Sequence, residues 1–193
     1  PPGKPLMPGT YKLVAVLDSV VATHVFTVME HPEQGKTNEY RAEQRAAYDE
    51  VEAIMKPILK DVERLQNMEE ILNKVQANMS LMGDSAKKEL GKIQKGANDT
   101  LQQLFELYFL PKEFKGYDHV SVRISNLSGA LANYLRADNR ADSENFELAK
   151  SRLLAAWGEA HEKQLAFENG IWKQFRAKVE EQQVDFFKSL DKD

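Results

Sequence analysis

The longest regular pattern in the sequence is an apolar repeat at helical spacing that runs from Thr37 to Met82. Its side chains recur at steps of three and four residues, as they do along one face of an α-helix: Tyr40, Ala47, Val51, Ile54, Ile58, Val62, Leu65, Leu72, Val75 and Met79. The pattern predicts a helix of roughly 65 Å, at 1.5 Å per residue. Pro57 lies inside it and predicts a kink or break near residues 53–57. A chain of 193 residues can cover such a stripe only with further helices.

Three further helices are predicted after this repeat. Gly83 ends the first helix, and Asp84 or Ser85 caps the second. The apolar spacing then predicts helices over residues 84–109, 118–136 and 143–190, with Val122 among the inward residues of the third and Leu165 in the stripe of the fourth. Gly158 and Gly170 are expected to bend the fourth helix. Helices 1 and 4 are the long ones, so they either project as a pair or have helices 2 and 3 end to end beside them.

A different period precedes the helices, in the segment PGTYKLVAVLDSVVATHVFTVME at residues 8–30. Its two runs are rich in β-branched and aromatic residues and are separated by Asp18 and Ser19, which favours two strands and a turn. An isolated two-stranded hairpin is marginally stable in water. We therefore expect this hairpin to pair with other strands or to lie on the helices.

These patterns predict a mainly α fold, an antiparallel bundle of about four helices, two of them long, preceded by a short β-hairpin. We place the Pro/Gly-rich lead and the hairpin at residues 1–36 and the bundle at residues 37–193. The chain begins with Pro1 rather than Met, so we expect a fragment or a processed product.

Composition narrows the classes of function. The formal net charge of −4 argues against a nucleic-acid binder, and no apolar run approaches the ~20 residues that span a bilayer. The chain has no cysteine, which excludes disulfides, thiolate metal sites and cysteine nucleophiles. The oligomeric state stays open.

No catalytic or metal-binding constellation emerges from the reactive side chains. The histidines are His24, His31, His119 and His161, and their spacing fits surface residues better than a zinc site. The carboxylates, Asp61 among them, are assigned to the polar faces of predicted helices. We therefore predict no enzyme activity, no cofactor and no metal.

Aromatic side chains near the C-terminus are the least ordinary feature of the helical region. A stripe at helical spacing is most often core. The alternative is an exposed patch for a partner, since aromatic residues are enriched at interfaces. Phe186 and Phe187 are adjacent, so one of them must leave the bundle-facing stripe. The candidate partner-contact residues are Trp172, Phe186 and Phe187.

Three segments together resemble a known architecture. PGTYKLVAVLD and FTVMEHPE resemble the last strands of an Ig-like module, and ISNLSGALANYLRADNRADSENFELAKSRLLAAWGE resembles the helical ending that follows it in bacterial sortilin-like proteins with BNR repeats. The sequence has HPE at residues 31–33 where that family has DPR. No β-propeller repeat is present.

This resemblance implies a non-catalytic accessory module at the C-terminus of a larger exported β-propeller protein of the bacterial cell envelope or exterior, acting by packing or by docking a partner. The partner it implies is a protein, either the upstream propeller or β domain or an envelope complex. Two alternatives remain open at this point. One is a free-standing, self-associating helical scaffold or adaptor, and the other is part of a glycosidase-like enzyme whose active site lies outside this chain.

Overall fold

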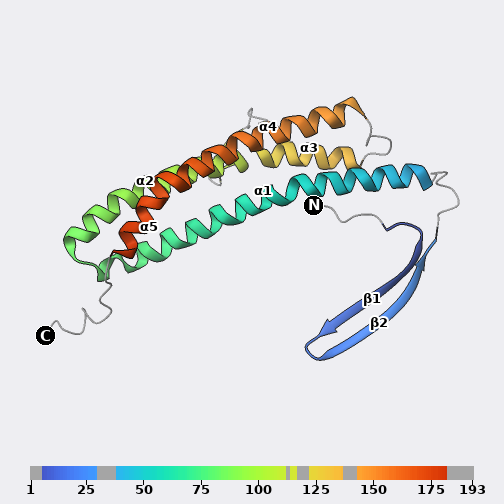
Figure 1. Ribbon diagram of the computed structural model, residues 1–193, viewed down its shortest axis with the longest axis horizontal. Helices are drawn as coiled ribbons and strands as arrows, with labels where there is room; N and C mark the ends of the chain where they lie inside the picture. Colours follow the sequence, from blue (N-terminus) through green and yellow to red (C-terminus); the bar gives the residue numbers. More distant parts are fainter. Residues whose placement is uncertain (1–5, 30–37, 112–113, 117–121, 137–142, 182–193) are drawn as a thin grey trace.

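The computed structural model describes residues 6–29, 38–111, 114–116, 122–136 and 143–181. A hairpin is followed by a helical bundle, as the sequence predicts (Figure 1). The elements in order are β1 (Gly9–Leu17), β2 (Val20–Val28), α1 (Asn38–Asn78), the 3₁₀ turn η1 (Met79–Leu81), α2 (Asp84–Tyr108), α3 (Ile124–Arg136), α4 (Glu144–Phe167), the π-helical turn η2 (Glu168–Trp172) and α5 (Lys173–Glu180).

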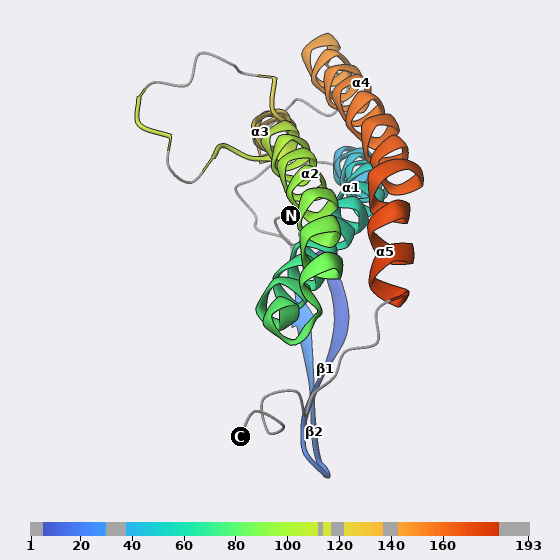
Figure 2. The same ribbon diagram turned by 90° about the vertical axis from the view of Figure 1, so that its left-hand side faces the viewer.

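The helices pack as three columns. In Figure 1, α2 and α3 lie end to end beside α1, while α4 and α5 form the third column and run in the same direction as α1. Figure 2 shows the same columns nearly end-on. This is the second of the two arrangements expected from the unequal helix lengths. It allows α1, about 60 Å long at 1.5 Å per residue, to be covered along most of its length.

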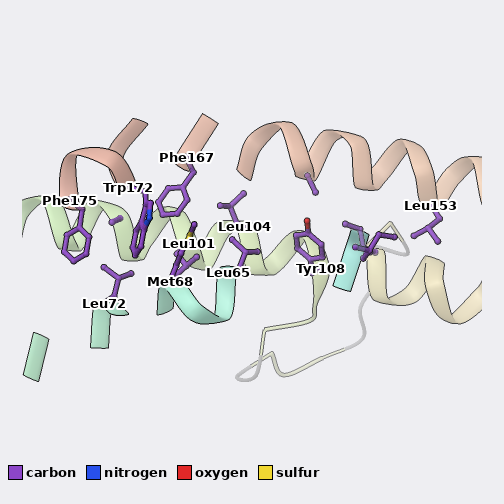
Figure 3. Close-up of a cluster of buried hydrophobic side chains, with 14 of the residues drawn as sticks. Leu65, Met68, Leu72, Leu101, Leu104, Tyr108, Leu153, Phe167, Trp172 and Phe175 are labelled. Carbon is purple, nitrogen blue, oxygen red and sulfur yellow. The ribbon is translucent and has the colours of Figure 1, made fainter. Parts of the chain in front are cut away.

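A single apolar core runs along the bundle, and part of it is shown in Figure 3. From α1 it takes residues at heptad-like spacing, including Val51, Ile58, Leu65 and Leu72. The middle column contributes Leu90, Ala97, Leu101, Leu104 and Tyr108 from α2, and Leu131 from α3. The third column supplies Phe146, Leu153, Phe167, Trp172 and Phe175. Burial of these side chains is the main force that holds the columns together.

Two local predictions for the first half of the bundle are wrong. Of the kink or break expected near residues 53–57, the break is absent: α1 is a single element from Asn38 to Asn78 with Pro57 inside it. Packing along both sides of Pro57 compensates for the hydrogen bond that a helical proline removes. The N-cap of α2 is Gly83, not Asp84 or Ser85, and no side chain caps that end.

The remaining helices differ from their predictions mainly at the ends. Helix α3 begins at Ile124. Val122, which is predicted to point inward, lies just before the helix and is 63% exposed. Residues 117–121 and 182–193 lie outside the described residues. Leu165, expected in the stripe of the fourth helix, is exposed. The buried face of α4 passes through Gln164 and Phe167 instead, and Leu165 lies outside that face.

The predicted bend at Gly170 is present, whereas α4 continues through Gly158. Gly170 has non-helical torsion angles (φ −97°, ψ −110°) within the π-helical turn η2. A π turn places residues five apart on the same face. The buried positions therefore step from Phe167 to Trp172, and Trp172 faces the core.

The hairpin forms with the predicted strands and turn. β1 and β2 pair antiparallel from Gly9 opposite Val28 to Leu17 opposite Val20. Asp18 starts the two-residue turn with φ +53°, a conformation that aspartate tolerates better than most residues. The rings of Tyr11 and Phe26 stack across the strands, with centroids 5.9 Å apart.

The hairpin does not lie on the helices. Figure 1 shows it projecting away from the bundle near the start of α1. Among the described elements, β1 and β2 pack extensively only against each other. Of the two expectations for the hairpin, packing on the helices is therefore wrong.

Candidate functional site

A charged residue lies on the buried stripe of α1. Asp61 is three residues after Ile58 and four before Leu65, and it is only 8% exposed. This spacing places its carboxylate on the face of α1 that meets the other columns. The assignment of Asp61 to a polar helix face is therefore wrong. A buried carboxylate needs hydrogen-bond donors to remain favourable.

Two donors from α4 reach the same oxygen of Asp61. The indole Nε1 of Trp157 donates to Oδ2 at 2.8 Å, and Nδ1 of His161 lies 2.8 Å from the same atom. Since a carboxylate accepts, Nδ1 carries the hydrogen in this pairing. The ring of His161 also packs on Trp157, with centroids 5.5 Å apart.

A buried glutamine extends this contact toward the other columns. Gln164 Nε2 lies 3.5 Å from the backbone oxygen of Asp61 and 3.2 Å from Glu168 Oε1, and Glu168 in turn pairs with Arg64 of α1. The hydroxyl of Tyr108 in α2 lies 3.5 Å from Gln164 Oε1. We call Asp61, Tyr108, Trp157, His161 and Gln164 the Asp61 cluster.

Electrostatics in the Asp61 cluster favour a neutral phenol. Burial raises the pKa of Tyr108 well above its ordinary value, and the nearby charge of Asp61 raises it further. Tyr108 therefore remains a hydrogen-bond donor across the physiological pH range. The cluster as a whole joins all three columns through polar contacts.

The Asp61 cluster is not predicted from the sequence. His24 is exposed as predicted, and His31 and His119 lie outside the described residues. His161 is different, because its side chain is 39% exposed and is tied to Asp61. The available signal was the i, i+4 spacing of Trp157 and His161, together with an aspartate in phase with an apolar stripe. No group of three or more metal-ligating side chains occurs within the described part of the chain.

A groove lies on the neighbouring face of α4. It has a volume of about 730 Å³ and runs between α4 on one side and the end of α2 with the start of α3 on the other. Its apolar lining includes Leu107, Leu127, Ala155, Ala156 and Ala160. Small alanine side chains on α4 keep the groove open.

Charged residues line the same groove. Glu159 lies on α4 between Arg152 and Lys163, and Glu106 and Arg123 lie on the opposite wall. A hydrogen bond joins the two parts of this wall: Arg123 Nε donates to the backbone oxygen of Glu106 at 3.2 Å. The groove thus combines an apolar floor with charges of both signs, a composition suited to another protein surface.

The three candidate partner-contact residues have separate outcomes. Trp172 is 7% exposed and packs between Phe167 and Phe175, with ring centroids at 6.0 and 5.4 Å, so its ring belongs to the core (Figure 3). Phe186 and Phe187 lie outside the described residues, so their role stays a prediction.

Taken together, the fold and these surfaces define an elongated helical-bundle protein with a projecting β-hairpin and an open groove. Residues 13–141 match the Brefeldin A-sensitivity protein 4-like domain, and the chain belongs to this family. The match crosses the predicted boundary between residues 36 and 37 and ends before α4. No curated protein and no solved structure matched the chain.

This family membership overturns the resemblance to bacterial sortilin-like proteins, because the Brefeldin A-sensitivity protein 4-like family is eukaryotic. The predictions of an accessory module on a BNR propeller and of bacterial export to the cell envelope are therefore wrong. The resemblance rested on hairpin strands followed by long helices, and a fold pattern of this kind does not by itself establish function. Throughout the described residues, no helix is both long enough and apolar enough to cross a membrane.

Proposed function

We propose that this domain is a non-catalytic protein-docking module of a eukaryotic protein connected with membrane trafficking. The family name, which refers to sensitivity to brefeldin A, supports the trafficking context. The docking part of the proposal is based on the groove between α4 and the column formed by α2 and α3. Its lining residues come from three helices that the core holds in place and from the two residues that precede α3.

The chemistry of the groove favours an amphipathic helix as its occupant. Such a helix lays apolar residues at i, i+4 and i+7 into a hydrophobic groove. On α4, Arg152 and Lys163 are separated by three helical turns, or roughly 16 Å at 1.5 Å per residue. A partner helix with carboxylates at that spacing and a basic residue opposite Glu159 matches the groove in charge as well as in shape.

Site-specific photo-crosslinking tests the docking proposal. A photoreactive amino acid replaces Ala155, which is exposed in the groove, and in a matched control it replaces Glu63, which is exposed on α1. In cells of the eukaryotic host, we expect a discrete protein adduct from position 155 and none of the same mass from position 63. Equal adducts at both positions, or none at position 155, would contradict docking at this groove.

Growth in the presence of brefeldin A tests the trafficking context. Cells that lack the protein are complemented with the wild-type chain, with Ala155→Glu or with Glu63→Lys. Ala155→Glu places a bulky charge in the groove, so we expect it to leave the altered sensitivity uncorrected, while wild type and Glu63→Lys restore it. Full restoration by Ala155→Glu would separate the groove from the trafficking role.

A further inference from the structure

The hairpin exposes apolar side chains on both of its faces. Leu13 and Leu17 on one face are 59% and 75% exposed, and Val16 and Val25 on the other are 66% and 60% exposed. The described helices do not cover either face, and the sheet contains two strands. Such a hairpin needs additional strands for independent stability.

The two edges of the hairpin differ in charge. Natural edge strands are commonly protected from further pairing by lysine or proline. β1 carries Lys12, whereas β2, with the sequence VVATHVFTV, carries neither lysine nor proline and no acidic residue. The edge of β2 is therefore the one that lacks this protection.

The turn determines which backbone groups of β2 point outward. In a two-residue hairpin, the residues that flank the turn, here Leu17 and Val20, form a hydrogen-bonded pair. Hydrogen-bonded and non-hydrogen-bonded pairs then alternate along the strands. The outward N–H and C=O groups of β2 consequently belong to Val21, Thr23, Val25 and Thr27.

The sequence of β2 is complementary to itself. If two copies meet antiparallel with His24 on a two-fold axis, all nine residues of each strand have a partner. The pairs are Val20 with Val28, Val21 with Thr27, Ala22 with Phe26, Thr23 with Val25, and His24 with His24 of the second copy. The residues with outward backbone groups face one another, and small Ala22 lies opposite large Phe26. No acidic or lysine side chain opposes a like charge.

We propose that β2 pairs with β2 of a second copy of this chain, which joins two hairpins into a four-stranded antiparallel sheet. This two-fold arrangement satisfies backbone groups that a face-to-face contact would leave unpaired. The proposed pairing goes beyond the docking function, because an assembly of two chains presents two grooves.

A positive charge introduced at the axis provides the first test. His24→Lys places two cations opposite each other in the dimer, where like charges are destabilising. Leu13→Lys is a matched control, since Leu13 is the cross-strand partner of His24 on the same face but lies on β1. By sedimentation of the full chain over a wide concentration range, we expect a dimer whose dissociation constant rises at least about tenfold with His24→Lys and changes by less than about twofold with Leu13→Lys.

Proline substitutions test the edge itself. Thr23→Pro removes an outward N–H from β2, and Val14→Pro removes the equivalent group from β1 opposite it. We expect Thr23→Pro to abolish the dimer and Val14→Pro to leave it intact. A monomer at every concentration, as expected if a strand of another protein occupies this edge, overturns the proposal. So does a dimer that depends on Leu13 or Val14 rather than on His24 or Thr23.

Discussion

Asp61 and Gly96 both contribute to the contacts between helices, although neither has an apolar side chain. Asp61 accepts hydrogen bonds from two side chains of α4, and Gly96 in α2 lies against η2. Neither role follows from helix propensity, because each depends on a side chain far away in the sequence.

Replacing Asp61 with alanine is expected to lower the free energy of unfolding by about 1–3 kcal/mol, because the Trp157 indole and the His161 imidazole lose their acceptor. Urea denaturation followed by circular dichroism measures this loss. The control, Glu63→Ala, removes an exposed carboxylate two residues away and is expected to change stability by less than about 0.5 kcal/mol. Equal losses of unfolding free energy for the two variants would contradict the hydrogen-bonded contact between Asp61 of α1 and the side chains of α4.

Gly96 allows a second prediction, tested by a double-mutant cycle. A Cβ at this position would lie 2.7 Å from Cδ1 of Ile171. Gly96→Ala alone should therefore gain less than the roughly 1 kcal/mol that alanine normally adds within a helix. In an Ile171→Val background, which removes that carbon, the same substitution should gain the full amount. Identical gains in both backgrounds would show that the contact does not limit the packing.

At the scale of elements, the helix ends differ in how their backbone groups are satisfied. Ser143 precedes α4, and its hydroxyl accepts from the backbone N–H of Phe146 at 3.2 Å, whereas Gly83 leaves α2 without a side-chain cap. Lys150 adds an ion pair between α4 and α1, at 2.6 Å from Glu50 Oε1. The first turns of α4 are thus anchored both locally and to a neighbouring column.

Loss of this cap is expected to destabilise the protein by about 1 kcal/mol in the Ser143→Ala variant. Ser143→Asp, which keeps an acceptor at the N-cap, should retain most of the stability. Ser151→Ala is the matched control, because Ser151 is an exposed residue within the same helix and alanine is the better helix former there. Thermal unfolding measures all three, and a Ser143→Ala protein as stable as wild type would disprove the capping role.

At the scale of the whole molecule, the bundle and the hairpin form two separately packed parts. Every buried apolar residue of the described chain lies between Ala47 and Phe175, within the helices and their connections. Hairpin side chains such as Val16 and Leu17 remain exposed. The stability of the bundle should therefore not depend on the hairpin.

Deletion of residues 1–29 tests this independence. Since no strand residue contributes to the core, we expect the free energy of unfolding of the bundle to change by less than about 0.5 kcal/mol. Guanidinium denaturation monitored at a helical circular dichroism band provides the measurement. A loss well above 1 kcal/mol would mean that the hairpin packs on the helices in solution.

Most of the secondary structure follows from local sequence patterns, because hydrophobic periodicity and turn residues act over a few neighbouring positions. The apolar stripe of α1, the strands on either side of Asp18, and the bend at Gly170 are all local signals of this kind. Helix α2 was predicted to within one residue at its C-terminal end.

Which of these residues contact one another depends on the packing of the helices. Asp61 and His161 are a hundred positions apart, and Trp172 is buried in the core where α4, η2 and α5 pack beside α2. The groove likewise combines side chains of α2, α3 and α4. Contacts between distant residues depend on the orientation of whole helices, and a periodic pattern along one segment contains no information about that orientation.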